Sequence, residues 1–411
     1  MSGIVLSTSV RQNLLSLQST AQLLATTQND LATGKKVNSA LDNPTNYFTA
    51  ASLDSRAGDI SNLLDAIGNG VQVLQAANTG LTSLQSLVAN AQSIANQVLQ
   101  TTVGYSTKAS ATSLAPTGAG AAGVAGTATD LTNGGTNSLN GKTFIFTPAT
   151  GSALTVTLGT AAGVNSLDAF NAALTSAGIG VVATLASDGS ITLTSSNDNA
   201  SQSLTLGNTA AAGTVAISGT DTATLVTPTG GSAGVPIADA ASQAVRANLV
   251  AQYNNVIKQI SNTAQDASFN GINLLNGDTL KLIFNETGKS TLSITGVTFD
   301  SNGLGLTSLT TGTDFLDSSS ANKVLSLLSA ASTSLRTEAS ALGSNLSIVQ
   351  IRQDFNKNLI NVLQTGSSNL TLADPNELAA DSQALSTRQS IAVSALALAN
   401  QSQQSVLMLL R

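Results

Sequence analysis

The sequence predicts a mainly α-helical protein that carries an inserted α+β domain. Two observations lead to this fold class. Near both chain ends, apolar and small residues recur in alternating steps of four and three, which is the 3.5-residue period of coiled-coil helices. Between about 101 and 240 this period is lost. Gly, Thr, Ala and Ser dominate there, in short runs that alternate between apolar and polar residues as β-strands do.

The N-terminal region divides into a helical segment at 1–40 and a long helix at 41–100. The first helix should end at Thr33–Gly34, because glycine readily adopts the left-handed conformation of a helix cap. A loop then leads to Pro44, whose fixed φ suits the first turn of the next helix. Three glycines inside that second helix, which lower its stability, allow a bend or a break: Gly68, Gly70 and Gly80.

The coiled-coil period defines one apolar seam in each terminal helix. The N-terminal seam consists of Val10, Leu14, Leu17, Ala21, Leu24, Gln28 and Leu31. The C-terminal seam consists of Leu385, Gln389, Ala392, Leu396, Ala399, Gln403, Val406 and Leu410. We expect both seams to serve self-assembly, because chain ends usually fray whereas these are among the most regular segments. The amides in the seams either fix register at a cost in stability or are tolerated imperfections.

Residues 101–240 are predicted to form a small inserted α+β domain. Alternating runs predict strands at 143–147, 154–158, 180–185 and 191–194, and the Asp-Gly turn at 187–190 joins the last two as a hairpin. A short helix should follow the cap residue Ser166. The glycine pattern at 118–123 resembles a dinucleotide-binding loop but lacks the preceding strand and following helix, so we interpret it as a linker.

Helical periodicity returns in 241–366 and in the C-terminal segment 367–411. A helix at about 240–264 is followed by a turn-rich stretch, a hairpin near 280–295, and a long helix at 319–364 that Gly366 should end. The C-terminal helix has a clear start signal. Asp374 is placed as N-cap, Pro375 at the first helical position and Glu377 at the capping-box position.

Composition excludes several classes of function. Hydrophobic residues make up 42% of the 411 residues, but only 3% are aromatic and 9% charged, which suits close helix packing better than one large core. The chain has no Cys and no His. Cys is a common nucleophile, His is the commonest general base, and both are common metal ligands. A net charge of −6 disfavours nucleic-acid binding, which needs a basic face. We therefore expect no enzyme, no cofactor and no metal site.

The sequence shows no cleaved secretory signal and no membrane span. No Lys or Arg precedes Arg11, and neither an uninterrupted apolar segment nor a cleavage motif follows. The apolar run at 391–399 is shorter than the ~20 residues that a spanning helix needs. The residues leave open a cytoplasmic location or export by a route without a cleaved signal.

Three motifs in this order resemble those of bacterial flagellins. They are Leu-Ala-Thr-Gly-Lys-Lys-Val-Asn-Ser-Ala-Leu-Asp at 31–42, Phe-Asn-Gly-Ile-Asn-Leu-Leu-Asn-Gly at 269–277, and the ending at 397–411. The likeness covers about 1–100 and 241–411. It implies a structural subunit of the flagellar filament used for swimming. In that family 1–40 and 367–411 would form an inner tube, 41–100 and 241–366 an outer tube, and 101–240 a surface domain.

The resemblance also implies a location and partners. The chain would be exported through the flagellar type III apparatus without a cleaved signal and would reside outside the cell in the filament. Its partners would be copies of itself, together with other flagellins, hook-associated and cap proteins, and an export chaperone. The alternatives are a hook–filament junction protein, which shares the terminal pattern, and an adhesin displayed through the insert.

The chain departs from the flagellin pattern in two ways. The insert precedes the helix at 240–264, whereas in many flagellins the variable domain follows the hairpin. In addition, the stretch recognised by the vertebrate innate flagellin receptor usually carries an arginine, and here it aligns with Ala89, Asn90 and Ile94. The missing charge predicts that this recognition is lost.

Overall fold

The computed structural model confirms the mainly α fold with a β-rich insert. It describes residues 8–113, 130–131, 140–159, 164–187, 189–206, 214–219, 225–226 and 235–409. The chain forms two compact units: the first contains 1–72, 280–294 and 345–411, and the second contains 73–279 and 295–344. The glycine pattern at 118–123 lies outside the described residues.

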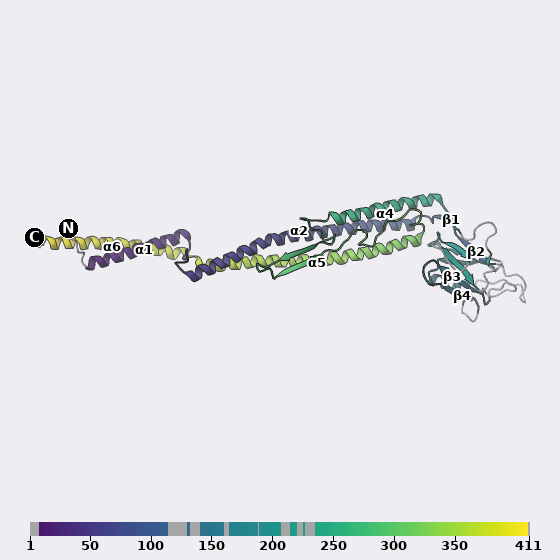
Figure 1. Cartoon of the computed structure of the whole chain (residues 1–411), viewed down its shortest axis with the longest axis horizontal. Coiled ribbons are helices and arrows are strands. Elements are labelled where there is room, and N and C mark those ends of the chain that lie inside the picture. Colours follow the sequence, from purple (N-terminus) through teal and green to yellow (C-terminus); the bar gives the residue numbers. More distant parts are fainter. Residues whose placement is uncertain are drawn as a thin grey trace. The chain divides into compact units, whose positions relative to one another are not determined.

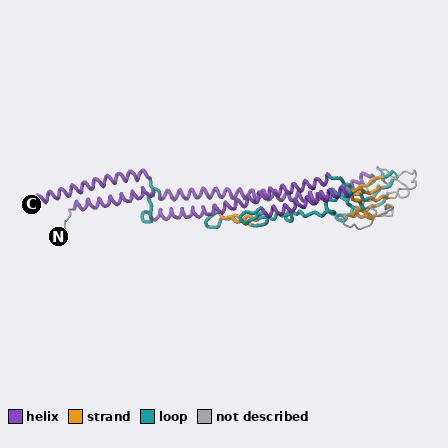
Figure 2. Tube along the Cα trace, turned by 90° about the horizontal axis from the view of Figure 1, so that it is seen from above, coloured by secondary structure: helices purple, strands orange, loops and turns teal. Residues whose placement is uncertain are grey.

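In the first unit the helices α1 (Thr8–Thr33) and α6 (Pro375–Leu409) lie side by side (Figures 1 and 2). Their ends follow the predicted signals. Gly34 after α1 has a φ of 69°, and α2 (Pro44–Gln100) begins at the predicted proline. Before α6, the Asp374 carboxylate accepts a hydrogen bond from the Asn376 amide at 2.8 Å, which caps the helix.

The same unit contains the first part of α2, the hairpin of β11 (Thr279–Ile283) and β12 (Thr291–Thr295), and the second part of α5 (Ser318–Thr371). The prediction that Gly366 ends α5 is wrong, because the helix continues to Thr371. A Cβ added at Gly366 would lie 3.5 Å from Leu53 Cδ1 of α2. That distance is an ordinary van der Waals contact, so this position has room for a Cβ, and Gly366 lies inside the helix without capping it.

Helix α2 has no break at its glycines. It runs without interruption from Pro44 to Gln100. A Cβ at Gly70 would meet the side chain of Leu282, and one at Gly80 would lie 2.7 Å from Leu275 Cδ1. Both glycines make room for side chains that pack onto the helix, so tertiary packing offsets their ~1 kcal/mol helix penalty.

The second unit combines the remaining parts of α2 and α5 with α4 (Ala240–Asp266), which runs beside them (Figure 1). Asp239 caps α4 by accepting a hydrogen bond from the Ser242 amide at 3.0 Å. The apolar faces of the three helices are buried; on α4 they include Leu249, Tyr253, Ile257 and Ile260.

The insert belongs to the second unit and contains, in its described part, two four-stranded sheets. One has the order β5 (Val181–Leu185), β6 (Ile191–Ser195), β2 (Ser110–Ser113), β9 (Leu225–Val226). The other has the order β4 (Leu154–Thr157), β3 (Thr143–Pro148), β8 (Thr214–Gly219), β7 (Ser203–Leu206), with β7 and β8 parallel. A short ribbon of β1 (Tyr105–Thr107) and β10 (Ile237–Ala238) joins the insert to the helices.

Local predictions for the insert are confirmed. Strands β5 and β6 form the predicted antiparallel hairpin, with Leu185 opposite Ile191. Helix α3 (Leu167–Ser176) begins after Ser166, whose hydroxyl accepts a hydrogen bond from the Ala169 amide at 3.2 Å. The α3 residue Phe170 packs against Phe144 of β3 with ring centroids 5.6 Å apart, which gives the insert a core of its own.

Candidate assembly interface

The two terminal helices bring parts of the predicted seams together. Val10 and Leu385 are buried, and seven further seam residues are half-buried: Leu17, Ala21, Leu24, Gln389, Ala392, Leu396 and Ala399. Leu14, Gln28 and Leu31 are exposed. Gln403 and Val406 lie within α6, and Leu410 lies outside the described residues. The contact between α1 and α6 thus uses only part of the N-terminal seam.

Apolar side chains outside the seams face solvent on both helices. On α1, Leu15 and Leu23 are 65% and 54% exposed. On α6, Ile391 and Leu398 are 63% and 72% exposed. In the sequence, the adjacent pairs Leu14–Leu15 and Leu23–Leu24 indicate a second apolar face on α1. Neighbouring residues point about 100° apart on a helix, so α6 cannot cover both members of each pair.

Two of these exposed side chains, Leu23 and Ile391, line a hollow between the two helices. The hollow has a volume of about 390 Å³. Its walls come from both helices: Ser16, Ser19, Thr20, Leu23, Leu385, Arg388, Ile391 and Ala392. Beyond Arg388, α6 carries no charged residue up to its end at Leu409. This composition suits burial against another apolar surface, because an unpaired ion in such a place is costly.

The loop after α1 is fastened to the segment between α5 and α6. The Lys36 amide donates to the Thr371 carbonyl at 2.8 Å, and the Ala373 amide donates to the Gly34 carbonyl at 3.0 Å. Val37 is buried beneath this contact. The side chains of Lys35 and Lys36 are exposed. The first flagellin-like motif, 31–42, is therefore a clasp that joins the end of α1 to the start of α6.

Asp42 organises the turn of that clasp. Its carboxylate accepts hydrogen bonds from the Asn38 amide at 3.0 Å and the Ser39 amide at 2.8 Å. The hydrogen bonds from Ser39 and then Asn38 lower the pKa of Asp42, since they stabilise the charged carboxylate. Asn38 also donates from Nδ2 to the Asp30 carboxylate at 2.8 Å. The turn holds Leu41 almost fully in solvent.

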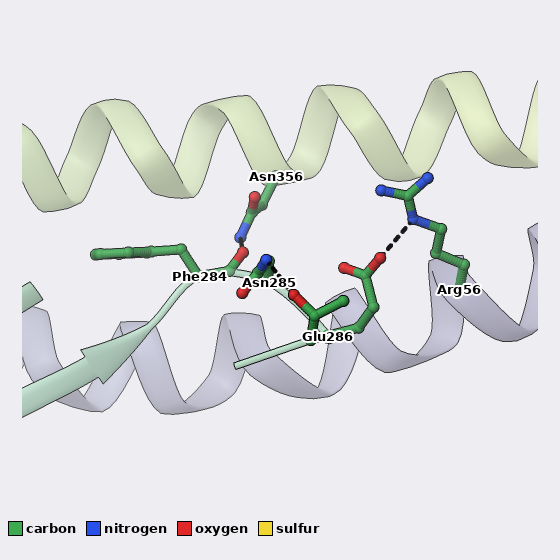
Figure 3. Close-up of polar contacts among 6 residues, drawn as sticks. Arg56, Phe284, Asn285, Glu286 and Asn356 are labelled. Atoms are coloured by element: carbon green, nitrogen blue, oxygen red, sulfur yellow. Dashed lines mark hydrogen bonds and ion pairs between the residues drawn. The ribbon is translucent and has the colours of Figure 1, made fainter. Parts of the chain in front are cut away.

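The hairpin loop packs on the helices of the first unit through polar contacts (Figure 3). Asn356 is buried on α5 and donates from Nδ2 to the Phe284 carbonyl at 2.9 Å. Arg56 on α2 pairs with Glu286 at 2.7 Å. The Arg352 guanidinium carbon lies 5.9 Å from the centroid of the Phe284 ring. Contacts to both helices fix the position of the loop.

The second flagellin-like motif forms the turn after α4. Asn270 and Gly271 have φ values of 50° and 78°, which Asn and Gly tolerate best. Asn273 is buried and donates from Nδ2 to the carbonyls of Ala264 and Gln265 at 2.8 and 2.9 Å. Its Oδ1 accepts from the Leu275 amide at 2.9 Å. The side chain of Asn273 therefore provides hydrogen-bond partners both for the last carbonyls of α4 and for an amide of the turn.

The stretch aligned with the receptor-recognition region lies on α2. Ala89 and Asn90 are exposed, and Ile94 is buried. Ala89 and Asn90 are thus accessible in the folded subunit, and they present neither a charge nor a large apolar surface.

No helix in the described part of the chain is long and apolar enough to cross a membrane. Within the same residues, no three carboxylate side chains gather into a group that could hold a metal ion.

Comparisons with known proteins find similarity at both ends of the chain. Residues 6–115 match the model of the bacterial flagellin N-terminal helical region, and residues 325–410 match that of the C-terminal helical region. Flagellin FljM of Caulobacter vibrioides is 32% identical over 165 residues, which are 40% of this chain and 59% of the relative. Flagellin FljO of the same organism is 31% identical over the same shares. Flagellin A of Rhizobium meliloti is 35% identical over 88 residues, 21% of this chain and 22% of the relative. The chain thus spans about three fifths of the Caulobacter relatives that it matches.

Proposed function

We propose that this chain, which matches the models of both terminal helical regions of bacterial flagellins, is a structural subunit that polymerises into the flagellar filament. One observation carries the proposal beyond family membership. The paired terminal helices leave Leu15, Leu23, Ile391 and Leu398 in solvent. An isolated subunit gains nothing from these side chains, whereas a polymer can bury them.

Burial of these side chains favours assembly. Removing one leucine or isoleucine side chain from water contributes about 1.5–3 kcal/mol. Four of them in every subunit supply a driving force that grows with each added copy. Contacts between different surfaces of identical subunits produce a helical filament when the rotation between neighbours does not close into a ring. The low charge of α6 lowers the desolvation cost of this packing.

The chain divides accordingly into layers of the filament. Residues 1–40 and 367–411 form an inner tube, 41–100 and 241–366 an outer one, and 101–240 project outward as the surface domain. Export without a cleaved signal delivers the subunit outside the cell. Its main partner is another copy of the chain, and other flagellins, hook-associated and cap proteins and an export chaperone are further partners.

Deletion of 389–411 tests the proposal. The deletion removes Ile391, Leu398 and the half-buried Gln389, Ala392 and Leu396 that face α1. The full chain should form long filaments that electron microscopy detects after the protein has been dissociated by heat and cooled. The truncated chain should stay a soluble monomer in sedimentation velocity. Filaments from the truncated chain would refute the proposal, and a full chain that never forms long filaments would favour a junction protein.

We further propose that the filament escapes the vertebrate innate flagellin receptor. The aligned positions Ala89 and Asn90 are exposed on α2 but lack the arginine that would anchor the interface. In a reporter-cell assay the purified protein should fail to activate the receptor. Activation at the potency of an ordinary flagellin would contradict the proposal. The Asn90→Arg variant serves as a gain-of-function companion.

A further inference from the structure

A buried arginine lies where the insert joins the helices of the second unit. Arg246 on α4 is 2% exposed. Its Nη1 donates to the Phe315 carbonyl at 2.9 Å, and its Nη2 donates to the Thr102 carbonyl at 3.1 Å. It thereby links three separate parts of the chain: the segment that enters the insert, the loop before α5, and α4. Burial lowers the pKa of Arg246, and the negative charge of Asp317 opposes that effect.

Asp317 is the buried counter-charge, and it contacts the insert directly. It is 4% exposed and immediately precedes α5. Its Oδ1 accepts from the Ser320 amide at 3.0 Å, which caps α5. Its Oδ2 accepts from the Ser201 hydroxyl at 2.5 Å and from the Ser201 amide at 3.3 Å. Nearby, the Ser319 amide donates to the Asp198 carbonyl at 2.8 Å. The turn at 196–202 of the insert is therefore bound to the first turn of α5.

The backbone at Phe315 is strained into position for this arrangement. Phe315 has a φ of 56°, which is rare for a bulky residue. Its side chain is fully buried and makes an edge-to-face contact with Tyr253, with ring centroids 5.8 Å apart. This conformation directs the Phe315 carbonyl at Arg246. Strain of this kind persists only where the surrounding structure enforces it.

The two chain segments that connect the insert to the helices form a ribbon with few contacts of its own. The chain enters through β1 and leaves through β10, and these strands pair at only two positions, with an irregular register between Tyr105 and Thr107. A two-stranded ribbon this short has little stability of its own. Its direction therefore depends on contacts outside the ribbon.

We propose that the contact between Asp317 and Ser201 is a latch that fixes the direction in which the insert projects from α4 and α5, and that Arg246 positions the loop before α5 by binding the Phe315 carbonyl. With the latch closed, the insert and the helices move as one body. With the latch open, the insert pivots on the β1–β10 ribbon while its own core stays folded. Arg246 and Asp317 are positioning residues, and Ser201 is the insert's half of the latch.

Distance measurements between spin labels test this latch. The chain has no Cys, so labels can be placed through two introduced cysteines without background. Val182→Cys on β5 and Leu327→Cys on α5 replace exposed side chains in the second unit. Pulsed electron paramagnetic resonance on the unpolymerised protein should give one narrow distance distribution. Adding Ser201→Ala removes the hydroxyl contact to Asp317 and should broaden this distribution.

A matched substitution controls for the loss of a hydroxyl. The Ser261 hydroxyl on α4 donates a hydrogen bond to the Ser301 hydroxyl at 3.1 Å, away from the latch. Ser261→Ala should leave the narrow peak unchanged. Ser201→Ala keeps the cap of α5 intact, so it should also leave the far-ultraviolet circular dichroism unchanged. A narrow, unshifted distribution in Ser201→Ala would overturn the proposal. Because the measurement uses monomers, it is independent of whether the chain forms filaments.

Discussion

Replacing Asn273 by alanine tests whether the turn after α4 depends on one side chain. The buried amide of Asn273 makes three hydrogen bonds, to the carbonyls of Ala264 and Gln265 and from the amide of Leu275. Removing it leaves the last carbonyls of α4 and one turn amide without these partners. The same turn positions Leu274 and Leu275, which are buried in the second unit.

The size of the effect follows from these contacts. A buried backbone group left without its partner costs about 1–3 kcal/mol. Two of the three bonds are fully buried and the third is partly buried, so Asn273→Ala should lower the free energy of unfolding by about 3–5 kcal/mol. Urea unfolding followed by circular dichroism measures the loss. Hydrogen exchange should show faster exchange at the end of α4.

Two companion variants make the test specific. Asn276→Ala changes an exposed asparagine three residues away and should alter stability by less than about 0.5 kcal/mol. Asn273→Asp keeps the acceptor for Leu275 but directs a carboxylate toward two carbonyls at the negative end of α4. It should therefore be at least as destabilising as the alanine variant. An Asn273→Asp protein more stable than Asn273→Ala would refute the reasoning.

Two other predictions concern alkaline pH and glycine. Burial raises the pKa of Tyr253 to about 12. The neutral Tyr253 side chain therefore contributes its full share of the free energy of unfolding below pH 10, and this share is lost as the pH rises from 10 through 12. The Tyr253→Phe variant should lose less stability over this range, by on the order of 2 kcal/mol in pH-dependent urea unfolding, and equal losses would contradict this. In Gly296→Ala the new Cβ would collide with the Leu274 backbone, which should cost several kcal/mol, about 2–4. The exposed helical Gly58→Ala should instead stabilise by up to about 1 kcal/mol, and thermal unfolding of both variants tests the difference in sign.

The fold was predictable where local chemistry decides it. The ends of α1, α2 and α6 follow from Gly34, Pro44 and Asp374, which act on their own neighbours. The prediction for Gly366 was wrong because a glycine lowers helix stability without always ending the helix, and α5 continues to Thr371. Strands β3 to β6 were predictable from alternation. The order of the two sheets was not, since it pairs strands such as β2 and β9 that are far apart along the chain.

The candidate interface shows the same division. The 3.5-residue period revealed both seams, and the structure buries Val10 and Leu385. Leu15 and Leu23 were missed because a search for one seam assumes one partner helix. Arg246 and Asp317 were not singled out either. Their burial arises from segments that only the folded chain brings together.

A pair of matched variants tests the central claim, that outward apolar side chains of the terminal helices drive polymerisation. Leu15→Asp with Leu23→Asp places charges at two exposed positions, so the monomer should keep its circular dichroism spectrum. Leu15→Met with Leu23→Met keeps the volume and the apolar character. Electron microscopy under polymerising conditions should show filaments from the methionine protein and none from the aspartate protein. Filaments of normal length from the aspartate protein would contradict the claim.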